Sequence, residues 1–352
     1  MEVNGFYSGQ RVLSTKDLDG LTPELFLVTS NKSAGKTTYF ANKLISDFLN
    51  EGKQFVVYYR FMNEIYDGGI KFYNDVSRMF FPEYDFKQTV LGAGSYCEIS
   101  INGKPAGWCL AINSADKLKR MSHFFNSASQ IFFDEFQSET NHYCPNELTK
   151  FYALHTALAR GNGQQRRYLP VYMCSNPYSL LNPYFVALGI SSRLKSDTKI
   201  LRGHGFVLEN DFISTASKAM ETSGFVKAFK AGGSSEIERY SQYSFQAVYM
   251  DDNAAFVEKL GGTSHYLLTL AYNGDRYAIR FFPQQGLFYC DNKYDETFPI
   301  KIAFSAADMT SEFTYQSTEI EKLRLMRNAF ERGKFRFKNV SCKDAIINFL
   351  RY

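Results

Sequence analysis

Two patterns of hydrophobic and polar residues alternate between residues 25 and 202. Short apolar runs that end in polar residues are separated by stretches with the spacing of amphipathic helices. The runs are LFLVT at 25–29, QFVVYY at 54–59, QIFFD at 130–134 and LPVYMCS at 169–175. Strands and helices that alternate in this way predict a mostly parallel β-sheet with crossover helices. Between the second and third runs, Asn102-Gly103 is a strong turn signal, which predicts an antiparallel insertion or edge pair.

The pattern changes after residue 203. Glycines, including those of AGGSSE at 231–236, interrupt short helical pieces, as in a linker module. The segment 265–292 then has the pattern of three strands, the first two joined by an Asn-Gly turn, and 318–330 has the pattern of an amphipathic helix. The apolar face of this helix consists of Ile320, Leu323, Met326 and Phe330. We therefore predict an α/β domain over 1–205, a linker module over 206–245 and an α+β domain over 246–352.

Composition and charge exclude several classes of protein. The 352 residues are 45% hydrophobic and 22% charged, as in ordinary folded soluble proteins. The first ten residues lack a signal-peptide pattern and no apolar run approaches the ~18 residues that span a bilayer, so we expect a cytosolic protein without a membrane partner. The six cysteines form no C-x-x-C pair, and the five histidines show no metal-binding spacing, so buried thiols are expected. From Glu321 to Tyr352, nine Lys or Arg residues accompany three Asp or Glu, which fits either a polyanionic partner or a solvated helix face.

The stretch SNKSAGKTT at 30–38 is the first candidate for chemistry. It follows an apolar strand and leads into a helical stretch. This order suits a phosphate-binding loop, because loop amides and the helix N-terminus then point at the same anion. The loop departs from the pattern G-x-x-x-x-G-K-[ST] because Ser30 occupies the first glycine position. Ser30 needs only a permissive backbone, whereas a side chain at Gly35 would collide with phosphates, so the loop is still predicted to bind nucleotide.

The residues predicted to contact ATP in this loop are Ser30, Asn31, Lys32, Ser33, Ala34, Gly35, Lys36, Thr37 and Thr38. Lys36 would reach the β- and γ-phosphates, and the Thr37 hydroxyl would bind Mg²⁺. QIFFDEF provides the carboxylates: Asp134 can hold Mg²⁺ and Glu135 can polarise the attacking water. We expect the loop and this carboxylate pair to lie on adjacent strands. An acidic pair that only solubilises a strand end is the alternative.

Other polar positions have both a functional and a structural interpretation. Asn176 ends the fourth strand and can sense the γ-phosphate, although Asn-Pro pairs also form ordinary turns. Arg60 ends the second strand and can contact phosphate or base, but basic residues are frequent at strand ends. Arg160, Arg166 and Arg167 lie in a glycine-punctuated loop. In a ring of subunits, an arginine there can reach the γ-phosphate of the next subunit, whereas a solvated or DNA-facing loop is the alternative.

Taken together, these residues resemble the genome-packaging ATPases of small tailed phages, the phi29-like group, which are distant relatives of large terminases. The resemblance rests on the phosphate loop, INGKPAGW at 101–108, FFDEF followed by YCPNEL at 132–148, CSNPYSLLNPYF at 174–185, and then FVEK, AYNGD, QGLFY and AFERGKFRF. It implies an ASCE P-loop ATPase domain with a mostly parallel sheet, an additional strand and a catalytic glutamate. It further implies a small linker module and a C-terminal α+β domain similar to an RNase H-like nuclease that has lost its catalytic carboxylates.

The resemblance also implies roles by position. They are phosphate and metal binding for Lys36 and Thr37, metal carboxylate and catalytic base for Asp134 and Glu135, sensor for Asn176, and arginine finger across a ring for Arg160. This chain departs from the family at Ser30 and at Met62, where a relative has a basic residue, which puts a contact between subunits from Met62 in doubt. In the C-terminal domain, Asp275, Asp291 and Asp308 are the candidate nuclease carboxylates. Exposed turn aspartates are far commoner than a metal-binding set, so we expect no nuclease activity.

The function implied is ATP-driven translocation of double-stranded viral DNA into a preformed capsid. The expected cofactors are ATP and Mg²⁺. The expected partners are double-stranded DNA, the capsid portal and identical subunits in a ring, expected to be a pentamer, with a structural RNA as a further candidate. The expected location is the cytoplasm of the infected bacterial host, transiently at the portal vertex of the capsid. A different ASCE-type DNA translocase or helicase, and a nucleotide-controlled scaffold that binds capsid or nucleic acid, are the alternatives.

Overall fold

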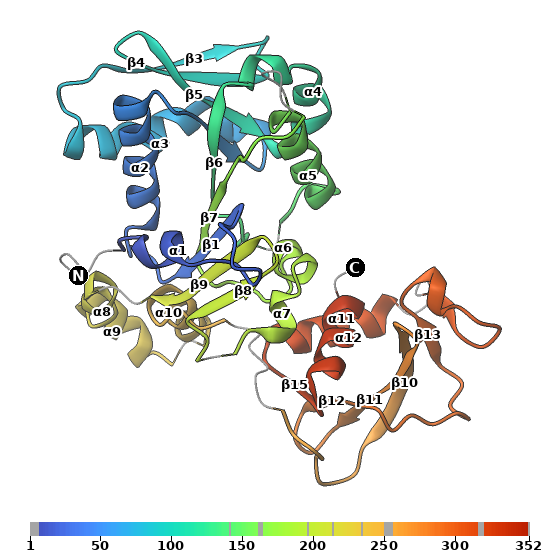
Figure 1. Ribbon diagram of the computed structural model, residues 1–352. Helices are drawn as coiled ribbons and strands as arrows, with labels where there is room; N and C mark the ends of the chain where they lie inside the picture. The colour runs from blue at the N-terminus through green and yellow to red at the C-terminus, as the bar shows by residue number, and fades with distance from the viewer. Residues whose placement is uncertain are drawn as a thin grey trace. The chain divides into compact units, whose positions relative to one another are not determined.

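The computed structural model describes residues 7–140, 142–160, 165–195, 197–212, 215–233, 235–249, 256–315 and 320–350. These residues form two compact units (Figure 1). The first comprises the described residues of 1–177 and 199–247, and the second those of 178–198 and 248–352. The boundaries therefore differ from the predicted ones. Residues 178–198 pack with the C-terminal unit, and 206–212, expected in the linker module, form a strand of the first unit.

A nine-stranded sheet, with the order β3-β4-β5-β2-β6-β7-β1-β9-β8, forms the centre of the first unit. The strands are β1 (Leu25–Ser30), β2 (Gln54–Tyr59), β3 (Phe86–Leu91), β4 (Tyr96–Ile101), β5 (Lys104–Ala111), β6 (Ala128–Asp134), β7 (Val171–Ser175), β8 (Ile200–Gly203) and β9 (Phe206–Phe212). All neighbours from β5 to β9 pair in parallel, and β3, β4 and β8 pair antiparallel. The mostly parallel sheet with an antiparallel edge pair is confirmed. Asn102 and Gly103, with φ of 49° and 73°, form the predicted turn between β4 and β5.

The described part of the first unit also contains helices. They are α1 (Gln10–Ser14), α2 (Lys36–Glu51), α3 (Ile65–Phe80), α4 (Ala115–Arg120), α5 (Glu147–Leu158), α8 (Thr215–Glu221), α9 (Gly224–Ala231) and α10 (Ser235–Phe245), with short 3₁₀ turns at Met62–Glu64, Ile112–Ser114 and Ser122–Phe125. On α2, Phe40, Ala41, Leu44 and Ile45 recur at helical spacing and are buried. The Phe40 ring stacks on Phe132 of β6 and Tyr172 of β7, with centroids 5.9 and 5.2 Å away. Burying one such side chain contributes about 1.5–3 kcal/mol, and the contact fixes α2 over the strands that carry the site.

The second unit contains a six-stranded sheet with the order β14-β13-β10-β11-β12-β15. Its elements are α6 (Pro183–Ala187), α7 (Ile190–Arg193), β10 (His265–Tyr272), β11 (Asp275–Phe282), β12 (Leu287–Asp291), β13 (Lys301–Ala303), a 3₁₀ turn at Ala306–Asp308, β14 (Thr314–Tyr315), α11 (Ile320–Glu331), β15 (Phe335–Phe337) and α12 (Val340–Leu350). The three predicted strands and the predicted helix are confirmed. Met326 and Phe330 of α11 are buried in one core with strands β10–β12 and α12, and Leu323 is partly buried against it. The side chain of Ile320 lies outside the described residues.

Two of the three carboxylates considered for a nuclease, Asp291 and Asp308, form polar contacts within the second unit. Asp308 accepts the N–H of Gly274 at 2.9 Å and the hydroxyl of Ser305 at 2.8 Å, so it fastens the turn between β10 and β11. Asp291 lies 3.5 Å from the guanidinium of Arg280. Among the described residues, no three His, Cys, Asp or Glu side chains are arranged to hold a metal ion.

All six cysteines are buried free thiols, as expected. In the ranges described above, none of the helices is both long enough and apolar enough to cross a bilayer.

Candidate nucleotide-binding site

The phosphate loop connects β1 to α2, and Lys36 is the first residue of that helix. The Lys36 side chain is buried, and its Nζ donates to the Ser30 carbonyl (3.1 Å), Ser30 Oγ (2.9 Å) and the Asn31 carbonyl (3.0 Å). It also donates to Asn176 Oδ1 at 3.2 Å. Burial lowers the pKa of Lys36 to about 8, so the ammonium remains largely charged at neutral pH. Lys36 and Asn176, predicted as phosphate ligand and sensor, are therefore in direct contact.

The loop backbone explains why serine is tolerated at the first glycine position. Gly35 has φ of 89° and Ser33 has φ of 59°, both in the left-handed region that favours glycine. Ser30, in contrast, is not among the described residues with positive φ. Because its conformation is open to any residue, the missing glycine does not distort the loop.

Asp134 and Thr37 face each other across the site. The Thr37 hydroxyl donates to Asp134 Oδ2 at 2.8 Å. Burial raises the pKa of Asp134 to about 6, although the hydrogen bond from Thr37 favours the ionised carboxylate. Their oxygen atoms are the ligand type that Mg²⁺ prefers, so the pair fits a magnesium ion.

The expectation that the loop and the carboxylates lie on adjacent strands is wrong. β7 lies between β1 and β6 and pairs in parallel with both. The two regions still meet because the carboxyl ends of parallel strands share one edge of a sheet. The inserted strand also brings Ser175 and Asn176 to that edge.

Glu135 follows Asp134 with φ of 52°, an uncommon conformation for a residue other than glycine. Its side chain is exposed and lines the same cavity as Lys36 and Asp134. Strained backbone of this kind clusters at functional sites and persists only where the surroundings impose it. The geometry therefore suits a carboxylate held at a fixed place beside the phosphate loop.

A cavity of about 890 Å³ joins these groups, within the size range of small-molecule sites. It is lined by Tyr7, Lys32, Ser33, Ala34, Gly35, Lys36, Thr37, Thr38, Tyr39, Asn42, Met79, Phe80, Asp134, Glu135, Ser175 and Asn176. Of the predicted loop residues, Ser30 and Asn31 lie buried beneath the cavity in contact with Lys36. Sequence reasoning missed Tyr7, Tyr39, Asn42, Met79 and Phe80. The i, i+3 spacing of Tyr39 and Asn42 after the loop is the one local signal that points to them.

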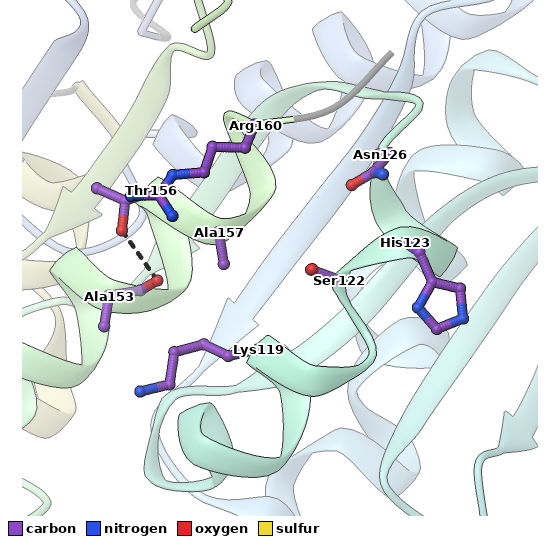
Figure 2. Close-up of a pocket in the computed structure, with 8 residues that line it drawn as sticks. All are labelled: Lys119, Ser122, His123, Asn126, Ala153, Thr156, Ala157 and Arg160. Carbon is purple, nitrogen blue, oxygen red and sulfur yellow. Dashed lines mark hydrogen bonds between the residues drawn. The ribbon is translucent and has the colours of Figure 1, made fainter. Parts of the chain in front are cut away.

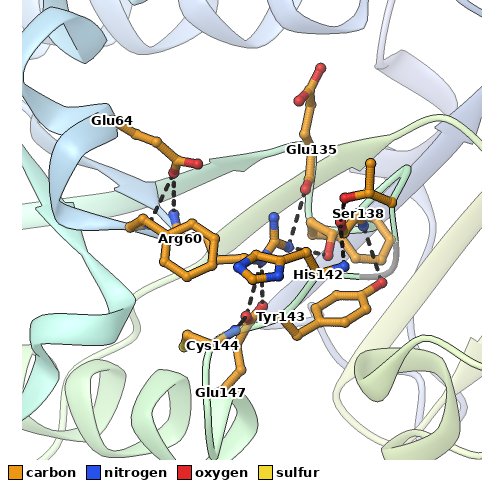
Figure 3. A network of polar contacts seen from close by, with 11 residues as sticks. Arg60, Glu64, Glu135, Ser138, His142, Tyr143, Cys144 and Glu147 are labelled. Atoms are coloured by element: carbon orange, nitrogen blue, oxygen red, sulfur yellow. Dashed lines mark hydrogen bonds and ion pairs between the residues drawn. The ribbon is translucent and has the colours of Figure 1, made fainter.

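Arg60, predicted to contact phosphate or base, does not line the cavity and has another role (Figure 3). Its Nε donates to both carboxylate oxygens of Glu147 at 3.1 and 3.0 Å, and both side chains are buried. Its Nη2 donates to the carbonyls of Glu135 (3.3 Å) and Phe136 (2.8 Å). The correction has a plain cause, since a buried guanidinium must be paired and Glu147 is the carboxylate within reach. Arg60 thus holds the main chain that carries Glu135.

The three loop arginines lie away from the cavity. Arg167 donates to the carbonyls of Leu158 (2.7 Å) and Ala128, the first residue of β6, which places the end of α5 at the amino edge of the sheet. Asp134 ends the same strand, which at ~3.3 Å per residue is roughly 20 Å away. Arg166 pairs with Glu24 at 2.8 Å, whereas Arg160 is exposed and has no hydrogen bond or ion pair with any described residue. Arg160 therefore cannot serve the cavity of its own subunit.

A second, open cavity of about 440 Å³ lies beside Arg160 (Figure 2). Lys119 of α4 and Arg160, just beyond α5, both line it, together with His123 and polar side chains. Lys119 lies 2.8 Å from Asp116, its neighbour one turn earlier. The sequence drew no attention to Lys119, because it belongs to a short charged helix without any motif.

Comparison with known proteins agrees with this geometry. The family model described as Podovirus DNA encapsidation protein (Gp16) matches residues 1–352. The DNA packaging protein of Bacillus phage phi29 is 24% identical over 355 residues, covering 100% of this chain and 98% of that protein. In the bacteriophage Phi-29 viral genome packaging motor assembly, a chain that is 23% identical superimposes with a TM-score of 0.59, covering 96% of this chain and 95% of that one. A chain of the Phi-28 gp11 DNA packaging motor, 16% identical, gives a TM-score of 0.60 over 99% and 97%. These likenesses show a shared fold.

Proposed function

This chain belongs to the podovirus DNA encapsidation protein (Gp16) family, and on that premise we propose that it is an ATPase that drives double-stranded viral DNA into a preformed capsid. The observation that carries the proposal is the meeting of Lys36, Thr37, Asp134 and Glu135 at one cavity on the carboxyl edge of the sheet. A cation, a hydroxyl and two carboxylates beside a loop of backbone amides are the groups that binding and hydrolysis of a nucleoside triphosphate require.

Each residue has a chemical task in this proposal. Lys36 exchanges its contacts with Ser30 and Asn31 for oxygens of the β- and γ-phosphates. Thr37 and Asp134 would hold Mg²⁺, which when bound neutralises charge on the phosphates. Glu135 accepts a proton from the attacking water, and the amide of Asn176, already at Lys36, orients the γ-phosphate or the water.

The position of Arg160 supports assembly into a ring. Because Arg160 is exposed at the opposite edge of the sheet from its own cavity, any nucleotide site that it completes would belong to a neighbouring subunit. There its charge would stabilise the transition state, with Lys119 as a second cation on the same surface. Five subunits are expected from the family resemblance, as are docking on the capsid portal and a structural RNA as a further partner. We also infer that the C-terminal unit is RNase H-like and that DNA is held through its phosphates, so packaging weakens with salt.

Mixing two inactive variants tests this reading. Glu135→Gln should bind ATP without hydrolysing it, and Arg160→Ala should fail because each neighbour lacks its arginine. In a 1:1 mixture, random placement around the ring gives about a quarter of the sites an intact Glu135 and an intact neighbouring Arg160, so ATPase activity should return. Neither variant alone should recover, and Arg324→Ala, an exposed arginine of α11, is the control.

If the mixture stays inactive, Arg160 does not act between subunits. A wild-type protein with no affinity for ATP would end the proposal as a whole. Dependence of turnover on capsids, rather than on DNA alone, separates a packaging motor from another DNA translocase. Turnover without DNA movement would instead favour a scaffold.

A further inference from the structure

The C-terminal end of α10 is fastened to the phosphate loop. The last carbonyls of a helix lack intrahelical donors and need partners from elsewhere. In α10, the Ser244 carbonyl accepts the N–H of Lys32 at 2.7 Å, and the Phe245 carbonyl accepts Asn31 Nδ2 at 3.3 Å. From α8, the Ser217 hydroxyl donates to the Lys32 carbonyl. Two of the helices that follow the large sheet, α8 and α10, are therefore bonded directly to the loop that would bind phosphate.

The side chain of Lys32 extends this junction to the segment behind Glu135. Lys32 Nζ lies 4.7 Å from the ring centroid of Tyr240 and 5.7 Å from that of Tyr243, both on α10. It also lies 3.5 Å from Glu139 Oε2. The Tyr243 hydroxyl donates to the other oxygen of the same carboxylate at 2.6 Å. We call these four residues, Lys32, Glu139, Tyr240 and Tyr243, the Lys32 clamp.

The clamp holds residues 135–139, which we call the catalytic segment, at one of two points of attachment. Glu139 follows Glu135 by four residues, and the first anchor is Arg60, which holds the carbonyls of Glu135 and Phe136. The left-handed backbone of Glu135 must be imposed by such contacts, because the residue does not favour it. With one anchor directly after β2 and the other on α10 and the phosphate loop, the segment is held from both sides.

We propose that the Lys32 clamp positions Glu135 for hydrolysis, so that α10 controls the rate of the chemical step. This inference rests on the proposed function, because it requires Glu135 to act as the base. Of the four clamp residues, Lys32 alone lines the cavity. Glu139 and Tyr243 thus act through the main chain and not through contact with nucleotide. Loss of their contact frees the segment to turn Glu135 away from the water, while the phosphate loop and its affinity for nucleotide are retained.

The test measures the effects of clamp substitutions on kcat and on KM of ATP hydrolysis separately. Glu139→Ala and Tyr243→Phe should each lower kcat of ATP hydrolysis, Glu139→Ala by about tenfold or more, since small displacements of a catalytic group cost that much or more. KM and the affinity for ATP should stay within about twofold of wild type, because the residues replaced do not line the cavity. Glu139→Gln, which keeps an acceptor for Tyr243 but loses the charge opposite Lys32, should fall between Glu139→Ala and wild type.

A double-variant cycle tests whether the residues act as a unit. Tyr243 reaches the segment through Glu139, so the double variant Glu139→Ala/Tyr243→Phe should be no slower than Glu139→Ala alone. The matched controls are Glu238→Ala on the exposed side of α10 and Tyr294→Phe in the second unit, both expected to keep the wild-type kcat.

Every result of these measurements either supports the inference about the Lys32 clamp or overturns it. A wild-type kcat in both single variants, an effect on KM alone, or losses that multiply in the double variant would overturn the inference. Should Glu139→Ala unfold early, the conservative pair Glu139→Gln and Tyr243→Phe decides by the same criteria. If wild type itself neither binds nor hydrolyses ATP, the proposed function has failed, which is a different result from wild-type turnover that the clamp variants leave unchanged.

Discussion

Replacing Arg60 with methionine tests the buried ion pair behind the catalytic segment. The side chains of Arg60 and Glu147 are 9% and 2% exposed, so the substitution leaves the Glu147 carboxylate buried without its charged partner. Removing one partner of a buried pair costs about 3–5 kcal/mol. At about 2–4 °C per kcal/mol for a unit of this size, the unfolding midpoint should fall by about 6–20 °C.

The chain offers a convenient probe for this measurement. Trp108 is the single tryptophan, it is buried, and it lies in β5 directly beside Val56 of β2, the strand that ends before Arg60. Tryptophan fluorescence during heating therefore reports on the sheet that carries the pair. The double variant Arg60→Met/Glu147→Leu removes both charges, so most of the lost stability should return.

Activity should not return with stability. Both variants lack the guanidinium that holds the carbonyls of Glu135 and Phe136, so kcat should remain low in each. If the double variant regained wild-type kcat together with its midpoint, Arg60 would only stabilise the fold. An unchanged midpoint in Arg60→Met would show that the burial argument itself is wrong.

Proton competition and backbone packing give two shorter predictions. Burial raises the pKa of Asp134 to about 6, so below that pH a proton occupies the proposed Mg²⁺ ligand. Mg²⁺-dependent binding of ATP should therefore weaken by up to about tenfold for each pH unit below 6. Above pH 6 the affinity should level off. Calorimetric titrations across this range should show the dependence, and affinity that rises toward acid would contradict it. An alanine Cβ at Gly107 would lie 2.5 Å from the Phe55 carbonyl oxygen, so Gly107→Ala should destabilise the first unit by about 1–3 kcal/mol. Gly224→Ala, in open space, is the matched control, and equal midpoints for the two variants would refute the packing argument.

Local patterns were sufficient for most of the fold. The strands at 25–30, 54–59 and 128–134 are buried apolar runs, and the turns at 102–103 and 273–274 are Asn-Gly pairs whose φ values are all positive. Such features depend on neighbours in sequence, so the sequence predicts them. The packing of residues 178–198 with the C-terminal unit depends on distant partners such as Met326 and Phe330, which share a core with Leu181 and Val186. No local pattern encodes that choice.

In the candidate site, too, some features depend on neighbouring residues in the sequence and others on distant residues. The phosphate loop and the acidic pair could be recognised because each is a short motif at the end of an apolar strand. The contacts that hold them in place could not, because the partners are far apart in the sequence: Arg60 and Glu147 differ by 87 positions, and Glu139 and Tyr243 by 104. The sequence therefore predicts the groups that we propose for the chemistry, but not the groups that position them.

The serine at the first glycine position illustrates why a motif is best judged by its geometry. A left-handed backbone favours glycine, and in this loop the left-handed positions are 33 and 35, not 30. Ser30 instead provides two oxygen atoms that accept hydrogen bonds from Lys36. An ammonium buried deeply enough for its pKa to fall to about 8 needs such acceptors. The departure from the pattern thus leaves the left-handed positions of the loop unchanged, and it supplies one additional acceptor, Ser30 Oγ, that holds Lys36 in place.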